Sequence, residues 1–329
     1  LLNQILIMHS KDKGVVLISI LLIVLLLSSV AVLFGNKYFL SLKRAQYIEF
    51  QTLSLNIFRN MESLAQDKIE KELRFNSNKL TKDNPIINEP MVFNLNGADV
   101  LGKISDYGNC FNINSIVKLN DSNYVENKNA VAAFRKILSL NEIDNNIIEE
   151  VIDQTIDWID KDTNPRAYGL EDYYYSGPLH SPREYTGMRL MVSIEELKSI
   201  PAVKQIDWNI FKNHFCAIPI LNELSLNINT LDLEDAYLLS SIFSNLTIKD
   251  AEYILDNIPK SGFDDLNNFI RSFPDLDLEL AYGNITVKSN IFELNSEVNF
   301  NKFISSSKSI IIYEDNNNGF IISRIYNGI

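Results

Sequence analysis

The chain has 329 residues, 46% of them hydrophobic and 22% charged, so it can bury a sizeable core and does not have the composition of a disordered chain. Only two cysteines are present, which excludes a small disulfide-dense scaffold. Thirty Lys and Arg residues against 42 Asp and Glu residues give a formal net charge of −12, and such a surface repels a phosphate backbone. We therefore expect no nucleic-acid partner.

The first marked pattern is the apolar run Val15–Phe34, which contains neither a charged residue nor a proline. As a helix it would span about 30 Å, the thickness of a bilayer core. A cleaved secretory signal would have a shorter apolar region, so the run predicts one transmembrane helix. Basic side chains flank both of its ends, at Lys11, Lys13, Lys37, Lys43 and Arg44. Charge alone therefore leaves the orientation open.

The helical pattern continues beyond this apolar run. Apolar side chains recur every three or four residues, at Phe50, Leu53, Ile57, Met61 and Leu64. This spacing predicts an amphipathic helix that runs to about residue 75 and packs its apolar stripe against the rest of the protein.

Short runs typical of β-strands flank the middle of the chain. They lie within 91–113, after a polar loop at 76–90, and resume after Gly283. The sequence Asn-Asn-Asn-Gly at 316–319 predicts a hairpin turn. Between these runs, residues 114–280 have helical periodicity, with predicted helices at 130–140, 143–159, 193–200, 235–246, 248–258 and 263–273. The pattern predicts a helical domain inserted into a strand-bearing one.

Two stretches of the helical region are similar: Phe-Asn-Ile-Asn-Ser-Ile at 111–116 and Leu-Asn-Ile-Asn-Thr-Leu at 226–231. A predicted helix, a short turn and a second helix follow each stretch. We expect Ser115 and Thr230 to cap the following helices, and the Asn side chains to satisfy backbone groups of the turns. Two related helical hairpins are therefore predicted. Their turns lack the glycines and basic residues of DNA-binding helical hairpins.

The densest polar cluster extends from the end of a predicted helix into the loop after it. Massed carboxylates on a turn suit Ca²⁺, which binds six to eight oxygen ligands in flexible geometry. The predicted ligands are Asp157, Asp160, Asp162, Glu171 and Asp172, completed by Asn164 or a backbone carbonyl. The spacing is not that of an EF-hand. The alternative is a solvated acidic loop whose charge is balanced locally by Lys161 and Arg166.

Cys110 and Cys216 are predicted to form one disulfide if the bulk of the chain lies outside the cytoplasm. Each precedes one of the two similar stretches, so the bridge would connect the two hairpins at equivalent points. The alternative is two separate buried thiols. The sequence contains no P-loop and no Gly-x-Ser-x-Gly, and His180 and His214 stand in no metal-binding or triad spacing. We therefore expect these histidines to be packing or surface residues, and the chain not to be an enzyme.

The junction before the apolar run resembles a type IV prepilin leader. A short segment ends in Lys11-Asp12-Lys13-Gly14, and the apolar run begins at once with Val15. Prepilin peptidase cuts such leaders after the glycine, which would leave Val15 as the first mature residue and the site of methylation. Two residues depart from the usual pattern. Ser19 stands where most pilins carry Glu, and Val15 stands where a bulkier residue is common.

Further motifs follow in a specific order: Cys110–Ser115, Asp157–Asp162 with Arg166, Gly169–Tyr174, Ile194–Leu197 and Asn227–Thr230. Together with Gly14 and Ser19, this order resembles the K-type minor pseudopilin of type II secretion systems, the general secretion pathway protein K family. The resemblance implies an α+β, type IV pilin-like fold. In this fold a long N-terminal transmembrane helix and an antiparallel sheet carry a large inserted α-helical domain. The implied segments are a leader at 1–14, the transmembrane part of the helix at 15–34, pilin-like parts at 35–113 and 281–329, and the insertion at 114–280. It also implies calcium binding at the acidic loop.

The resemblance further implies a structural role. With the I-type and J-type minor pseudopilins, such a protein would form the tip of the periplasmic pseudopilus and help to initiate its assembly on the type II secretion inner-membrane assembly. It would be a single-pass inner-membrane protein with the bulk of the chain in the periplasm. In pilin fibres the buried Glu pairs with a neighbour's N-terminal amine, so a subunit with no neighbour above it would tolerate Ser19. The alternative is a membrane-anchored periplasmic receptor or sensor domain, which would keep residues 1–14.

Overall fold

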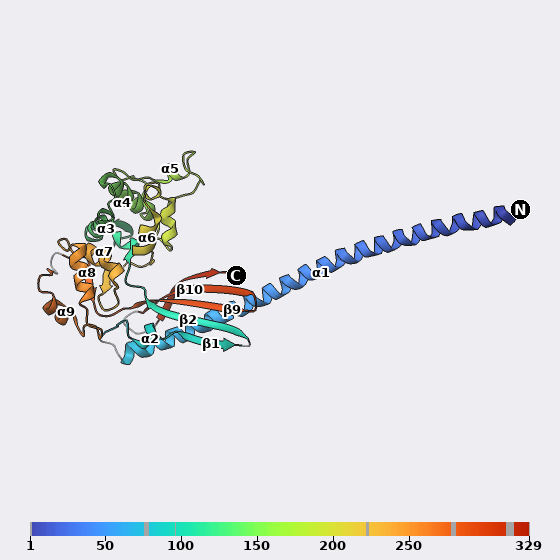
Figure 1. Ribbon diagram of the computed structural model, residues 1–329. Coiled ribbons are helices and arrows are strands. Elements are labelled where there is room, and N and C mark those ends of the chain that lie inside the picture. The colour runs from blue at the N-terminus through green and yellow to red at the C-terminus, as the bar shows by residue number, and fades with distance from the viewer. Residues whose placement is uncertain are drawn as a thin grey trace.

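The computed structural model describes residues 2–75, 79–95, 97–221, 224–277, 281–313 and 319–328, with side chains from residue 15 onward. A long helix projects from a head that contains a sheet and a group of short helices (Figure 1). The predicted hairpin turn at 316–319 lies outside these residues except for Gly319, where a strand begins.

Helix α1 (Leu2–Phe75) ends at the residue predicted from its periodicity. Its first half, with all of 15–49 exposed, extends away from the head, and its second half lies against the sheet (Figure 1). The predicted stripe is buried at Phe50, Ile57 and Met61, but Leu64 is 43% exposed. The face that packs against the sheet also includes Phe58 and Ala65, which are fully buried. The second half of α1 is thus the central element of the pilin-like core.

The sheet has five antiparallel strands in the order β1-β2-β9-β10-β11. Their bounds are β1 (Met91–Leu95), β2 (Ala98–Asp106), β9 (Ile291–Phe300), β10 (Phe303–Tyr313) and β11 (Gly319–Asn327). Alternate side chains face α1 because a strand presents successive residues to opposite faces. Val100, Leu294 and Val298 form the centre of this layer. The predicted type IV pilin-like arrangement of one long helix on an antiparallel sheet is therefore confirmed.

The helical part is inserted between β2 and β9, which are neighbours in the sheet. Its helices are α3 (Lys128–Leu140), α4 (Asn145–Ile159), α5 (Asp172–Tyr175), α6 (Trp208–His214), α7 (Ala236–Ile242), α8 (Ile248–Asp256) and α9 (Leu266–Ser272). Its short strands are β3 (Phe111–Asn112), β4 (Val117–Asn120), β5 (Asn123–Glu126), β6 (Phe215–Cys216), β7 (Ser225–Asn227) and β8 (Asn284–Thr286). A single large apolar cluster fills this part. A further short helix, α2 (Pro85–Asn88), lies between α1 and β1.

The two related hairpins are present as α3 with α4 and α7 with α8. A short parallel strand pair accompanies each: β3 pairs with β6, and β7 pairs with β8. The second asparagine of each repeated stretch also makes the same contact. Asn114 accepts from the N–H of Met191 and donates to its carbonyl, both at 2.8 Å. Asn229 does the same to Phe263, at 2.7 and 2.9 Å. The repeat in sequence is therefore a repeat in structure.

Two local predictions for these stretches were wrong. Ser115 does not cap a helix, because it lies inside a buried 3-10 turn (Ile113–Ile116) that Asn112 caps instead. Thr230 donates its hydroxyl to Asp106 at 2.6 Å, across the junction with the sheet. The helix predicted at 193–200 is a 3-10 helix (Ile194–Ser199). It ends before Pro201, because proline has no backbone N–H with which to continue the hydrogen bonding.

A buried carboxylate connects the insertion to the end of β2. Asp106 accepts hydrogen bonds from the hydroxyls of Ser289 and Thr230, from the Gly108 N–H and from the Asn227 amide. Burial raises the pKa of this carboxyl, and the four donors oppose that rise. Three segments distant in sequence therefore meet at one side chain.

Cys110 and Cys216 form the predicted disulfide, with their Cα atoms 5.8 Å apart. Cys216 and Ile218 pack with Ile291 and Ile310, on the face of the sheet away from α1. The predicted link between two hairpins was wrong. The bridge lies at the β3–β6 pair. Strand β6, which contains Cys216, pairs with β3 before the second hairpin begins, so both cysteines belong to the first hairpin. It therefore closes the base of the first hairpin and fastens it to the sheet.

Candidate metal centre

The acidic loop begins where α4 ends. Asp144 caps the helix N-terminus, and Ile148, Ile152, Ile156 and Ile159 anchor it in the apolar cluster. Two acidic residues of this helix, Asp153 and Asp157, lie one turn apart on one face, and Asp160 caps the C-terminus of the helix. All three are buried. The loop then crosses back over this face before α5 starts.

Three carboxylates converge in this loop. Ligand oxygens of Asp160, Asp162 and Glu171 all lie within 4.8 Å of one another. Asp160 and Glu171 are buried, whereas Asp162 is exposed. One oxygen of Asp160 and both oxygens of Glu171 have no hydrogen-bond partner among the described residues. Buried carboxylate oxygens without a partner are costly, so these three residues are candidates for binding a cation.

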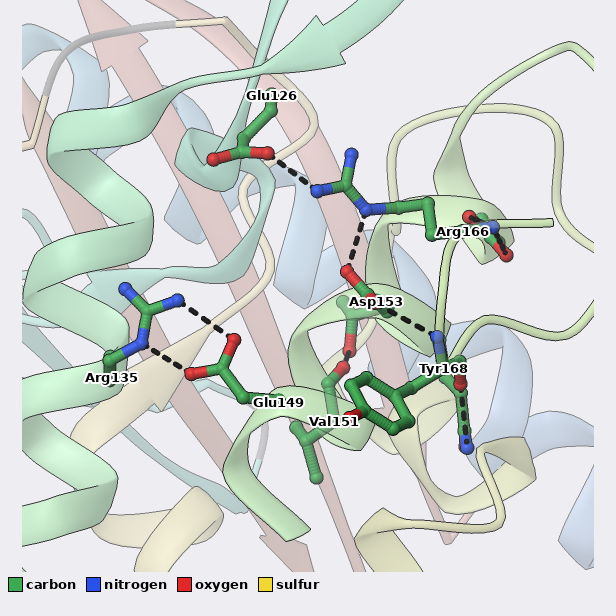
Figure 2. Close-up of polar contacts among 10 residues, drawn as sticks. Glu126, Arg135, Glu149, Val151, Asp153, Arg166 and Tyr168 are labelled. Atoms are coloured by element: carbon green, nitrogen blue, oxygen red, sulfur yellow. Dashed lines mark hydrogen bonds and ion pairs between the residues drawn. The ribbon is translucent and has the colours of Figure 1, made fainter. Parts of the chain in front are cut away.

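The basic residues of the loop are engaged elsewhere. Arg166 donates from Nε to Asp153 at 2.7 Å and from Nη2 to Glu126 of β5 at 2.5 Å (Figure 2). Lys161 donates to the Ser122 carbonyl at 3.2 Å. Among the described residues, neither base forms an ion pair with the three converging carboxylates. The charge of Arg166 lowers the pKa of Asp160 without a direct contact, so the local charge balance of this loop is only partial.

Asp157 and Asp172 flank the three converging carboxylates. Asp157 accepts from the Arg166 backbone N–H at 3.1 Å. A Cβ atom at Gly169 would come within 1.8 Å of its carboxylate, so only glycine leaves room for it there. Asp172 accepts from the N–H and the hydroxyl of Thr186, both at 2.8 Å, and so fixes the next loop. Asn164 is exposed, and its backbone N–H donates to Asp162.

The pKa values of these carboxyl groups are raised by burial and by the charges of neighbouring carboxylates. Burial is the largest cause of a rise in the pKa of Glu171 to about 8, and the charges of the other predicted ligands contribute to the same rise. Burial raises the pKa of Asp157 to about 7, with Asp160 adding to the effect. Burial together with the charge of Asp162 raises the pKa of Asp160 to about 6. The cluster therefore resists full ionisation at neutral pH, and a bound cation would remove that resistance.

Sequence reasoning missed the partners that hold this loop in place. Tyr168 donates its N–H to Asp153 at 3.1 Å, and Arg135 forms a two-point contact with Glu149 on the same side of α4 (Figure 2). Only Arg166 gave a sequence signal, as one of two bases within an acidic run. Glu126 gave none, because it lies 40 residues away on β5.

Two aromatic side chains close the buried side of the loop. The rings of Trp158 and Tyr175 meet edge to face, with centroids 5.0 Å apart. Neither the Trp158 N–H nor the Tyr175 hydroxyl has a hydrogen-bond partner among the described residues. Unpartnered buried polar atoms therefore gather around the acidic loop, as expected where an ion and its hydration complete the structure.

The two histidines pack as the sequence predicted. His180 is buried, with Nε2 2.5 Å from Glu184, and its ring lies against Tyr175. The Ser199 hydroxyl donates to Glu184 and not to the imidazole, so these three side chains do not form a nucleophile and base. His214 lies beside Tyr237, and burial lowers its pKa.

Comparison with known proteins gives consistent results. Two sequence models described as Type II secretion system (T2SS), protein K match residues 109–220 and 226–283, together more than half of the chain. Type II secretion system protein K of Aeromonas hydrophila is 25% identical over 332 residues, covering 97% of this chain and 98% of the relative. The protein of the same name from Pectobacterium carotovorum subsp. carotovorum is 27% identical over 259 residues, covering 78% of each.

The fold also matches a solved structure. One chain in the crystal structure of the GspK-GspI-GspJ complex, from the type 2 secretion system of enterotoxigenic Escherichia coli, aligns with a TM-score of 0.73 at 21% identity. The alignment covers 86% of this chain and 99% of that chain. The fold of the aligned part of this chain is thus already known from experiment.

Proposed function

Because the chain belongs to the type II secretion system protein K family and is a minor pseudopilin, we propose that it forms the tip of the pseudopilus and helps to initiate its assembly. Its partners in this proposal are the I-type and J-type minor pseudopilins. Support comes from the solved relative, which was crystallised as a GspK-GspI-GspJ complex. The tip is a structural role and requires surfaces, not a catalytic centre.

The observation that carries the tip position is the placement of the insertion. Its helices lie beyond the sheet, on the side away from the N-terminus of α1 (Figure 1). Pilin-like subunits stack along their N-terminal helices, so a further subunit above this one would meet the insertion. A subunit with this much added structure at its far end fits best where no further subunit follows.

Ser19 supports the same position. Its hydroxyl donates to the Val15 carbonyl at 3.0 Å, one turn back along α1. The side chain therefore has its hydrogen bond within its own helix and needs no partner in lipid. A glutamate at this position would need a positive group from another subunit.

The apolar part of α1 anchors the protein. Among the residues that the structure describes, one helix is long and apolar enough to cross a membrane, at Val15–Phe75, and its most apolar window is fully exposed. The chain is therefore a single-pass membrane-anchored protein. We place the anchor in the inner membrane and the head in the periplasm, where the Cys110–Cys216 disulfide is stable.

We also propose that the acidic loop holds a structural Ca²⁺. Asp160, Asp162 and Glu171 would bind it directly, and the flanking carboxylates of Asp157 and Asp172 would add to the negative field. The unpartnered oxygens of the buried pair are the observation that carries this proposal. The ion would neutralise the carboxylates and keep the loop folded over α4.

Processing gives the first prediction. We expect prepilin peptidase to cut between Gly14 and Val15, and Gly14→Leu to block the cut, because the enzyme must approach that backbone closely. Intact-mass analysis of the membrane-bound protein measures the cut directly. Gly14→Ala serves as the control and should still be cut in part. A wild-type chain that keeps residues 1–14 in secreting cells would instead favour the anchored receptor.

The tip proposal is tested by co-purification. The full chain, solubilised in detergent, should recover co-expressed I-type and J-type minor pseudopilins in fixed proportion. Secretion is scored in the same cells. This measurement distinguishes a failed assembly from the effect of removing the apolar anchor alone. Recovery of neither pseudopilin would refute the tip assignment.

A further inference from the structure

A groove lies between the second half of α1 and the last strand of the sheet. Its volume is about 370 Å³. One wall is a stripe along α1, and the other is β11; the lining residues are Arg59, Glu62, Ser63, Gln66, Ile321, Arg324 and Tyr326. The groove is on the pilin-like part of the head, separate from the acidic loop.

Two arginines and one glutamate are the charged residues among those that line the groove. Glu62 is 3% exposed and accepts from Nε of Arg324 at 2.8 and 3.1 Å, and from the Ser309 hydroxyl at 2.6 Å. Both hydrogen bonds from Arg324 come from its Nε, and its side chain lines the groove and is 43% exposed. Arg59 is exposed, and its guanidinium group forms no hydrogen bond or ion pair among the described residues. The groove therefore has one uncompensated positive charge on a protein of net charge −12.

The groove runs beside a free sheet edge. Within the described residues, β11 pairs with β10 alone and ends the sheet. Gln66 donates to the Gly319 carbonyl at 2.8 Å and so fixes the start of this edge against α1. An exposed edge of nine residues can accept another extended segment through main-chain hydrogen bonds.

Sheet geometry links these two features. A segment laid beside β11 would direct alternate side chains toward α1, and these side chains would enter the groove. A carboxylate at such a position would meet the guanidinium groups of Arg59 and Arg324, which favour paired hydrogen bonds to carboxylates. On the other face, Phe320 and Ile325 are exposed and would contact the intervening side chains.

We propose that this groove receives an extended acidic segment of a neighbouring pseudopilin subunit. The inference rests on the proposed function and specifies one of its contact surfaces. Arg59 lies about 38 Å along α1 from the end of the apolar run, so the contact would form in the aqueous compartment. An extended segment is favoured over a helix because the sheet edge offers backbone groups along its whole length.

The test uses the full chain co-expressed with the I-type and J-type minor pseudopilins. Arg59→Glu should reduce the recovered partner at least about tenfold, since it places a like charge against the incoming carboxylate. Lys68→Glu is the matched control, because nine residues at 3.6 per turn place it on the opposite side of α1. A photo-crosslinking residue in place of Ile325 should attach to a pseudopilin peptide that contains Asp or Glu, and the same residue in place of the exposed Tyr253 should not.

Charge reversal of the cross-linked acidic residue to Arg should then restore recovery with Arg59→Glu. Normal recovery with Arg59→Glu, or a cross-link only to a second copy of this chain, overturns the inference and leaves the tip role standing. Failure of the wild-type chain to recover either pseudopilin overturns both.

Discussion

Replacement of Cys110 by serine is expected to lower the free energy of unfolding by about 2 to 5 kcal/mol. The bridge spans a sequence separation of 106 residues, and the chain-entropy model gives about 4.7 kcal/mol for a loop of about 100 residues. The serine side chain would replace a half-buried sulfur that packs against the cluster of Ile218, Ile291 and Ile310. Urea unfolding of the full chain in detergent, followed by tryptophan fluorescence, measures the loss.

The control for this experiment is the double variant Cys110→Ser with Cys216→Ser. A reducing agent should destabilise the wild-type chain to about the level of this variant, and should leave the variant itself unchanged. We expect the fluorescence change to report mainly on the insertion, because Trp158 and Trp208 both lie there. Alkylation of both wild-type thiols in the folded, non-reduced protein would contradict the bridge.

Calcium is expected to raise the melting temperature of the wild-type chain in a concentration-dependent way, and a chelator to lower it. An ion at 100 times its dissociation constant adds about 2.7 kcal/mol if it binds only the folded state. Asp160→Asn with Glu171→Gln should abolish the response, because these changes remove the two buried ligands. Differential scanning calorimetry at increasing millimolar Ca²⁺ measures it.

The matched control is Asp83→Asn with Glu252→Gln, which makes the same change of charge at two exposed residues outside the loop. This variant should keep the full calcium response. Identical melting temperatures of metal-free and calcium-saturated wild-type protein would mean that the acidic loop is only solvated.

The metal-free protein should also become less stable as pH rises. Asp157, Asp160 and Glu171 have pKa values raised to about 7, 6 and 8, above the 3.8 and 4.5 of unperturbed Asp and Glu. Because the folded state holds these protons more tightly, its extra stability is fully present below about pH 4. It is then lost as pH rises through about 6 to 8. Saturating Ca²⁺ should remove this decline, since the ion replaces the protons.

Part of the candidate site was predictable because it is local in sequence. Asp160, Asp162 and Glu171 lie within 12 positions, so a single loop can bring them together. Asp172 was predicted to be a ligand, but its hydrogen bond with Thr186 could not be predicted from the sequence pattern. Thr186 belongs to the following loop. The partners of Arg166 were hidden for the same reason, since Glu126 belongs to a different strand.

The sequence by itself determined the elements whose signal is periodic and local. The length of α1 up to Phe75, the alternation along β2 and β9 and the two repeated stretches all follow from side-chain spacing. The tertiary structure alone decided the pairing of β3 with β6, the closure of the first hairpin by Cys216 and the groove beside β11. Each of these three features depends on which segments, distant in sequence, pair their backbone hydrogen-bonding groups and pack their apolar surfaces together. That choice is made by the folded chain as a whole, and no local spacing encodes it.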